Sequence, residues 1–245
     1  MLRTIIRNRF FFREFIILFL LVISGCKTIN SPVFGGTVKD IDGNVYNTVT
    51  IGSQTWMMEN LKTTHYNNNT AIPMVTDSAG WKKLKTPGFC WYKNDSTSNK
   101  KAFGALYNWY AADTSILAPT GWHIPTEEDW NLLESNVSVY LYASGSLAKI
   151  LASNTGWNKS LNTGAIGNNL SLNNSSGFTA LPGGSRENYI HSFNSIDSTG
   201  VWWSSANKSD TTGLSVLMRC DFNSVDRINK YKWKGLSIRC VKNQN

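Results

Sequence analysis

Apolar and polar residues alternate over residues 45–51, in the order Val-Tyr-Asn-Thr-Val-Thr-Ile. A period of two is typical of a β-strand that buries one face. The Asp-Gly pair at residues 42–43 is a type I′ turn signal, and the Gly-Ser pair at residues 52–53 predicts a second turn. Residues 54–61 continue as another strand, so we expect a β-meander here.

Three segments in the middle of the chain predict helices. Residues 104–112 place their larger apolar side chains on one helical face. The clearest helix start is at Thr126, which can cap the first turn and is followed by acidic residues that suit the positive end of a helix. We expect this helix to run to about Ser135 with Trp130 pointing inward, and residues 146–152 predict a shorter one.

The second half of the chain predicts one long loop and several strands. Residues 154–176 are rich in Asn, Gly, Ser and Thr with little periodicity, which is typical of a surface loop. Strand-like runs follow at residues 177–181, 201–205, 214–220 and 236–241. Since there is no internal repeat and no second domain boundary, the pattern predicts one α+β domain with strands at both ends.

The first 25 residues have the three parts of an export signal. Basic residues come first, at Arg3, Arg7, Arg9 and Arg13. An apolar run over residues 15–23 follows, and small residues close the segment. Because this run is well short of the roughly 20 residues of a permanent membrane helix, residues 1–25 predict a signal peptide.

Residues 23–26, Ile-Ser-Gly-Cys, resemble the lipobox of bacterial lipoproteins, in which a peptidase cuts before the Cys and fatty acids such as palmitate are attached to it. The resemblance implies that Cys26 is lipidated and is the first residue of the mature protein. Several acyl chains would hold the protein stably in a membrane. Residues 26–37 then form a lipidated Cys and tether, and residues 38–245 form the domain. The alternative is an ordinary secretory signal with a chance Cys at its end.

Residues 27–31 have no Asp beside Cys26 and no acidic cluster. They lack both the inner-membrane retention signal and the acidic surface-export signal known in some lipoproteins. We therefore expect an extracytoplasmic protein anchored in the outer membrane, with its periplasmic or surface orientation left open.

The charge of the mature protein is smaller than that of the whole chain. Removing the four Arg and one Glu of residues 1–25 leaves 20 basic and 15 acidic residues, a net charge of +5 instead of +8. The densest basic segments are residues 82–83 and 230–234. We interpret them as solvated surface and expect no nucleic-acid partner.

The cysteines after Cys26 are Cys90, Cys220 and Cys240, in a compartment that permits disulfides. An odd number allows at most one pair. We favour Cys220 with Cys240, because both lie in strand-like runs near the end of the chain. The alternative is that all three are buried as small apolar side chains.

No metal or cofactor site is expected. The three histidines lack a local metal spacing and there is no C-x-x-C pair. Residues 40–44 look faintly like a calcium loop, but a hairpin turn is the stronger interpretation. Three acidic residues over 127–129 are explained by the start of a helix, so they need no catalytic role.

Five ordered motifs resemble the Fibrobacter succinogenes major paralogous domain family. They lie at residues 40–46, 56–62, 104–110, 119–126 and 177–184, and the resemblance covers about residues 38–242. Membership would imply a lipid-anchored or secreted bacterial protein of uncharacterised function.

A more distant likeness concerns the fold. Residues 124–130 resemble the Leu-Pro-Thr-Glu-x-Glu-Trp helix start of formylglycine-generating enzymes, and residues 235–240 resemble their closing Gly-Phe-Arg strand. Those enzymes have a C-type lectin-like architecture, which the resemblance implies here. Their activity is not implied, because the cysteines of this chain lie outside the matching motifs. The Fibrobacter succinogenes family usually has Cys where Ala118 stands, so a disulfide of its members is missing or rerouted through Cys220.

Aromatic faces beside amides, acids and a guanidinium suit sugar or peptide ligands. The candidate binding residues are Trp91, Asn94, Asp95, Arg186, Trp202 and Trp203. Burial is the alternative for most of them, since adjacent Trp residues on a strand turn at least one indole inward. The loops at residues 154–176 and 185–199 are the better location for recognition.

The leading hypothesis is a non-enzymatic cell-envelope module that binds a glycan or protein and contacts the membrane through its lipid anchor. An enzyme acting on envelope polymers or exported proteins is one alternative. A purely structural surface protein is the other.

Overall fold

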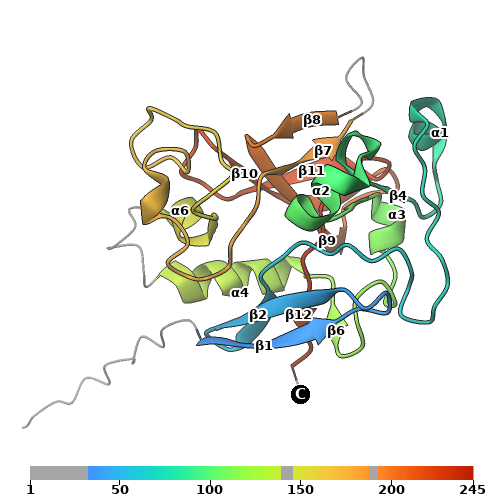
Figure 1. The fold of residues 1–245 in the computed structure, drawn as a ribbon, viewed down its shortest axis with the longest axis horizontal. Helices are drawn as coiled ribbons and strands as arrows, with labels where there is room; N and C mark the ends of the chain where they lie inside the picture. Colours follow the sequence, from blue (N-terminus) through green and yellow to red (C-terminus); the bar gives the residue numbers. More distant parts are fainter. Residues whose placement is uncertain (1–32, 139–145, 188–192, 245) are drawn as a thin grey trace, which may run out of the picture.

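The computed structural model describes residues 33–138, 146–187 and 193–244 (Figure 1). The predicted signal peptide of residues 1–25 and the predicted lipidation of Cys26 lie outside these residues and stay predictions. Within the described ranges, no helix has the length and apolar character needed to cross a membrane.

Antiparallel sheets and a few short helices make up the regular structure, which confirms the α+β prediction. The strands are β1 (Val33–Lys39), β2 (Val45–Ile51), β3 (Gln54–Met57), β4 (Phe89–Cys90), β5 (Leu106–Tyr107), β6 (Trp122–His123), β7 (Gly183–Arg186), β8 (Phe193–Ile196), β9 (Thr199–Asn207), β10 (Thr212–Arg219), β11 (Asp226–Tyr231) and β12 (Val241–Lys242). The helices are α1 (Ser78–Lys83), α2 (Ser96–Phe103), α3 (Trp109–Ala112), α4 (Glu127–Val137) and α6 (Leu147–Leu151), with 3-10 turns η1 (Tyr92–Asn94) and η3 (Leu170–Leu172). One sheet has the order β1-β2-β3-β12-β6 and another has the order β11-β10-β9, so the first and last strands share a sheet.

Strands β1, β2 and β3 form the predicted meander. The Gly43 N–H donates to the Asp40 carbonyl at 3.0 Å, and the φ of Gly43 is +78°, which confirms the turn. The predicted tether of residues 26–37 is wrong at its end, because β1 already begins at Val33 and pairs with β2. Strand β3 ends at Met57, earlier than predicted.

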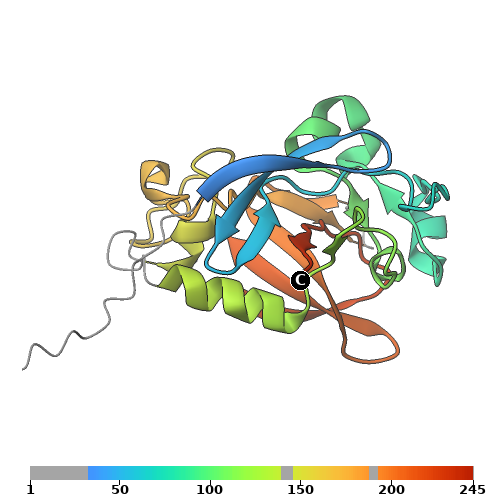
Figure 2. The ribbon, with the colours of Figure 1, turned by 90° about the horizontal axis from the view of Figure 1, so that it is seen from below.

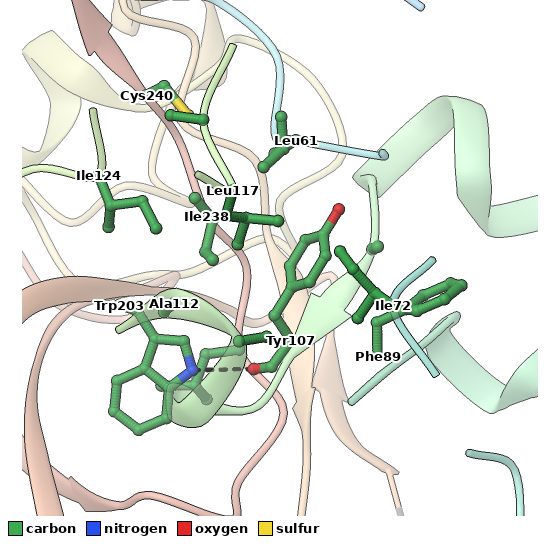
Figure 3. Close-up of a cluster of buried hydrophobic side chains, with 14 of the residues drawn as sticks. Leu61, Ile72, Phe89, Tyr107, Ala112, Leu117, Ile124, Trp203, Ile238 and Cys240 are labelled. Carbon is green, nitrogen blue, oxygen red and sulfur yellow. Dashed lines mark hydrogen bonds between the residues drawn. The ribbon is translucent and has the colours of Figure 1, made fainter. Parts of the chain in front are cut away.

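Strand β9 passes between two clusters of buried side chains. Because adjacent residues of a strand point to opposite faces, Trp202 joins the cluster of Trp56 and Trp130, whereas Trp203 joins the cluster of Tyr107. Figure 3 shows the second of these clusters, in which the Trp203 Nε1–H donates to the Tyr107 carbonyl at 2.8 Å. Both faces of β9 are therefore core.

Helix α4 begins as predicted. The Asp129 N–H donates to Thr126 Oγ1 at 3.1 Å, and the Thr126 N–H donates to the Asp129 carboxylate at 2.9 Å, which completes a capping box. Trp130 is buried as predicted, and the helix continues to Val137. It packs against β2, β9 and α6, in the foreground of Figure 2.

The helix predicted for residues 104–112 is largely wrong. Leu106 and Tyr107 form β5, which pairs with β4, and only residues from Trp109 onward are helical. The Asn108 side chain accepts a hydrogen bond from the Ala111 N–H and starts this short helix.

Some predicted strands are also shifted. Residues 177–181 form a turn with a single bridge, and the strand begins at Gly183. Strands β9 and β10 confirm the predictions for residues 201–205 and 214–220, and the sequence pattern did not predict β11. The strand predicted for residues 236–241 makes isolated bridges and ends in the short β12.

The loop at residues 154–176 has almost no regular structure, as predicted, but it is tied to the core. Lys149 on α6 is buried, and its ammonium donates to the carbonyls of Ala165 at 3.2 Å and Asn168 at 2.5 Å. Burial lowers the pKa of this lysine. Trp157 and Ile166 of the loop are themselves buried, so only part of this segment is surface.

The predicted Cys220–Cys240 disulfide is absent, because both thiols are free among the described residues. Cys240 is buried in the cluster of Tyr107, whereas Cys220 packs against the cluster of Trp56. The two thiols therefore pack in different parts of the core. Cys90 is also free and buried, and burial raises its pKa to about 11.

Candidate ligand-binding site

Trp202 and Trp203 do not form a binding surface. Each is 0% exposed, and each indole N–H is used inside the protein: Trp202 donates to Asn60 Oδ1 at 2.9 Å and Trp203 to the Tyr107 carbonyl. A ligand cannot reach either ring without disrupting the core. These two predicted site residues are structural.

Arg186 and Trp91 are also buried. The Arg186 guanidinium donates to the carbonyls of Val75 at 2.5 Å and Thr76 at 2.8 Å, and it lies 4.3 Å from the centre of the Trp81 ring. It therefore ties β7 to the segment before α1. Trp91 belongs to the core cluster of Tyr107.

Asn94 and Asp95 lie at the surface, but both have local roles. The Asn94 amide donates to the Thr76 carbonyl at 3.1 Å. The Asp95 carboxylate accepts from the Ser98 N–H at 3.1 Å and caps α2. The six predicted binding residues thus do not come together as one exposed site.

A different pocket combines exposed aromatic and basic side chains. It lies between the end of α1, α3 and the end of β11, and its volume is about 300 Å³. The lining residues are Lys82, Lys83, Leu84, Lys85, Tyr110, Thr211, Tyr231 and Trp233. We call it the lysine–aromatic pocket.

Burial of Trp81 explains how α1 presents its lysines. The helix starts at Asp77, whose carboxylate accepts from the Gly80 N–H, and Trp81 packs beneath the Arg186 guanidinium. With Trp81 facing inward, Lys82 and Lys83 at the end of the helix are exposed.

The aromatic wall is formed by the last residue of β11 and by the turn after it, in which the Lys234 N–H donates to the Tyr231 carbonyl at 2.9 Å. Tyr231 and Trp233 are two residues apart, whereas Lys232 between them is buried with its ammonium 4.2 Å from the centre of the Trp109 ring. The Tyr231 and Trp233 rings are nearly parallel, with an angle of 11° between planes and centroids 5.9 Å apart. Tyr231 is 54% exposed, so this pair offers ring surface to a ligand.

The pocket is strongly basic. Lys82, Lys83 and Lys85 are exposed, and no carboxylate of the described residues forms an ion pair with them. Beside the pocket, Lys230 and Lys234 share the single carboxylate of Glu187. Burial lowers the pKa of Lys230, and the neighbouring Lys234 lowers it further.

The fold therefore joins the two densest basic segments of the sequence. Residues 82–83 are exposed, as the sequence interpretation required, but they line one pocket with Tyr231 and Trp233 from the segment of residues 230–234. Proximity of segments this far apart in the chain cannot be read from local pattern. The closeness of Tyr231 and Trp233 in the sequence was the available signal for an aromatic wall.

A second pocket, of about 310 Å³, lies beside His123. His123 Nε2 is 2.9 Å from Asp129 Oδ2, and His123 Nδ1 is 2.8 Å from Asn243 Oδ1. The hydrogen bond to Asp129 raises the pKa of His123, and these contacts help to hold the pKa of Asp129 at about 2. With an oxygen beside each ring nitrogen, His123 links the start of α4 to the end of the chain.

Side chains that could bind a metal are dispersed. In residues 33–138, 146–187 and 193–244, no group of three or more His, Cys, Asp or Glu side chains is placed to hold an ion. In the segment that looked faintly like a calcium loop, the Asp40 carboxylate accepts from the Tyr46 hydroxyl at 2.6 Å and from the Asn44 N–H at 2.9 Å. Asp42 instead pairs with His65 at 2.6 Å. These contacts are those of a hairpin turn.

Comparison with known proteins gives one match. The family model described as the Fibrobacter succinogenes major domain matches residues 49–242, which is most of the chain and confirms the family. Four of the five motifs lie within the matched range, whereas the motif at residues 40–46 precedes it. No curated protein matches the chain. No solved structure matches it either.

Proposed function

We propose that this chain, which belongs to the Fibrobacter succinogenes major domain family, is a lipid-anchored cell-envelope module that binds a glycan without chemically changing it. The observation that carries the proposal is the parallel pair of Tyr231 and Trp233 in the lysine–aromatic pocket. Ring faces stack on the apolar C–H faces of sugars, and lysine ammonium groups donate hydrogen bonds to sugar oxygens.

The size of the pocket supports a short stretch of a polymer as the ligand. Its volume of about 300 Å³ is at the lower end of small-molecule sites. Tyr231 also remains 54% exposed although aromatic side chains gain free energy from burial, which favours a recognition role for the ring.

We further propose a C-type lectin-like architecture and a lipid at Cys26. The α+β composition, the shared sheet of β1 and β12 and the long loop at residues 154–176 support the architecture. An experimental structure superposed on formylglycine-generating enzymes tests it, and a different strand order would exclude it.

The position of the N-terminal strand gives the proposed anchor an orientation. Helix α1 lies at one end of the long axis of the molecule, and the start of β1 lies far from it, toward the other side (Figures 1 and 2). From Cys26 to Val33 the chain can span at most about 25 Å. An outer-membrane lipid at Cys26 would therefore hold the β1 end near the bilayer and direct the lysine–aromatic pocket away from it.

Binding of the purified mature chain to a panel of envelope polysaccharides tests the function. We expect Tyr231→Ala with Trp233→Ala to weaken binding at least tenfold, because the stacking surface is removed. Phe222→Ala is the matched control, since Phe222 is an exposed aromatic residue outside the pocket, 41% accessible. Unaltered binding by the double variant, or release of a cleaved product from the polysaccharide, would overturn the proposal.

A further inference from the structure

We infer that the glycan bound in the lysine–aromatic pocket is acidic, with carboxylate or sulfate groups held by Lys82, Lys83 and Lys85. This inference rests on the proposed glycan binding by Tyr231 and Trp233 and adds the chemical class of the ligand. It depends on the charge of the pocket and on the shared location of lysines and rings.

The charge of these lysines is uncompensated within the described residues. Some other cations are paired: Lys208 with Glu127 at 2.5 Å, Arg219 with Asp226 at 3.1 Å and Arg227 with Glu134 at 2.5 Å. Isolated exposed lysines such as Lys39 and Lys159 are also without an ion pair to any described residue, so what distinguishes Lys82, Lys83 and Lys85 is that three unpaired ammonium groups line one pocket with two aromatic rings. The carboxylate of Glu187 is shared by Lys230 and Lys234, and no acidic residue of the described chain lines the pocket. A ligand that brings its own negative charge would therefore meet no competing carboxylate at Lys82, Lys83 and Lys85.

Helix-end electrostatics explains only part of this arrangement. Cations are favourable in the last turn of a helix, where Lys82 and Lys83 lie. Lys85, however, follows the end of the helix at Lys83 and still lines the pocket. A six-residue helix also has a weak dipole, so the third lysine and the shared pocket need another reason.

Contact with the aromatic pair favours an acidic sugar over a simple anion. A free ion would contact the ammonium groups alone. Tyr231 and Trp233 line the same pocket, and their faces suit the sugar ring to which the acidic group is attached. The absence of an Arg from this lining also favours separate point contacts over bidentate binding of one phosphate group.

Paired polymers that differ only in charge test the inference. The probes are polygalacturonate against its methyl ester, for carboxylates, and dextran sulfate against dextran, for sulfates. We expect the mature chain to bind at least one acidic member tenfold or more tightly than its neutral partner, and the difference to shrink as salt is raised from 50 to 500 mM.

A triple variant locates the effect. Changing Lys82, Lys83 and Lys85 to Gln should weaken binding of the acidic polymer at least tenfold and abolish its preference over the neutral polymer. The matched control changes Lys39, Lys101 and Lys159 to Gln, which removes the same charge from exposed positions outside the pocket. Thermal unfolding of both variants checks that they are folded.

The outcomes separate this inference from the proposed function. If the Tyr231 and Trp233 variant loses glycan binding but charge and the three lysines have no effect, the ligand class is wrong and the glycan-binding function stands. If no polymer binds, both proposals fail. Tight binding to vesicles containing phosphatidylglycerol, lost in the lysine variant, with no preference among the sugars would overturn the inference in favour of a membrane contact.

Discussion

His123 shows how one residue can join distant parts of the chain. Its ring nitrogens contact Asp129 at the start of α4 and Asn243 near the end of the chain. Local pattern predicted the role of Asp129 in the helix start but not this contact, because the pairing of β12 with β6 brings Asn243 beside His123.

This contact should make stability depend on pH. The pKa of His123 is raised in the folded protein, so its stabilising contribution is complete below the unfolded pKa of about 6.5 and is lost as pH rises through the folded value. The pKa of Asp129 is lowered to about 2, so its contribution is present above about 3.8 and is lost below that pH. We expect His123→Ala to lower the free energy of unfolding by roughly 0.5–1 kcal/mol at pH 5, after allowance for solvent screening, and by less at pH 8.5. Urea unfolding at both pH values measures this, and an equal loss at both would contradict it.

Burial divides the tryptophans into two classes with opposite expected phenotypes. Trp202→Ala should lower the free energy of unfolding by about 3–5 kcal/mol, because it removes a fully buried indole and its hydrogen bond to Asn60. Trp233→Ala, which removes a half-buried ring, should cost under about 1.5 kcal/mol and weaken ligand binding. Chemical denaturation of both variants gives the comparison. Equal destabilisation by the two changes would place Trp233 in the core and remove it from the candidate site.

The sequence could not make this division for Trp202 and Trp203. Alternation states that their side chains point to opposite faces of a strand, but it does not state how many of those faces are covered. Two separate core clusters cover both faces of β9, and those clusters are assembled from distant segments. Sequence reasoning therefore predicted an inward indole correctly and still offered the pair as a binding surface.

At the scale of elements, α4 was predictable because its signals are local. Thr126 and Asp129 are three residues apart and form the capping box with each other. Leu106 and Tyr107 are the opposite case, since they have helical spacing but pair with β4, some 17 residues earlier. The hydrogen bonds and packing of such a strand pair outweigh the weak helix propensity of a short segment.

The capping box gives a test at this scale. Thr126→Ala should lower the free energy of unfolding by about 1 kcal/mol, because the Asp129 N–H loses its acceptor at the start of α4. Thr120→Ala is the control, since Thr120 is exposed and precedes the helix. Urea unfolding compares the two variants. A change at Thr126 no larger than the change at Thr120 would show that the capping box does not stabilise the domain.

At the scale of the whole molecule, the basic and aromatic residues of the candidate site come from opposite halves of the domain. Residues 82–85 follow the N-terminal sheet, and residues 230–234 end the three-stranded sheet. The segments meet because Arg186 on β7 packs over Trp81 and pairs with Gly235 beyond β11. Without that topology, each lysine cluster in the sequence resembles an ordinary solvated surface.

The proposed orientation of the molecule on the membrane leads to a prediction about the lipid anchor and the pocket. If Cys26 carries the lipid, palmitate labelling in cells should be present in the parent and lost in Cys26→Ala. The lipidated chain, once bound to vesicles, should still bind a soluble polysaccharide as tightly as the unlipidated variant, because the start of β1 lies far from α1 along the long axis of the molecule. Equal labelling of the two proteins would refute the anchor. A lipidated protein that binds vesicles but no longer binds the polysaccharide would refute the orientation, since the pocket would then face the membrane.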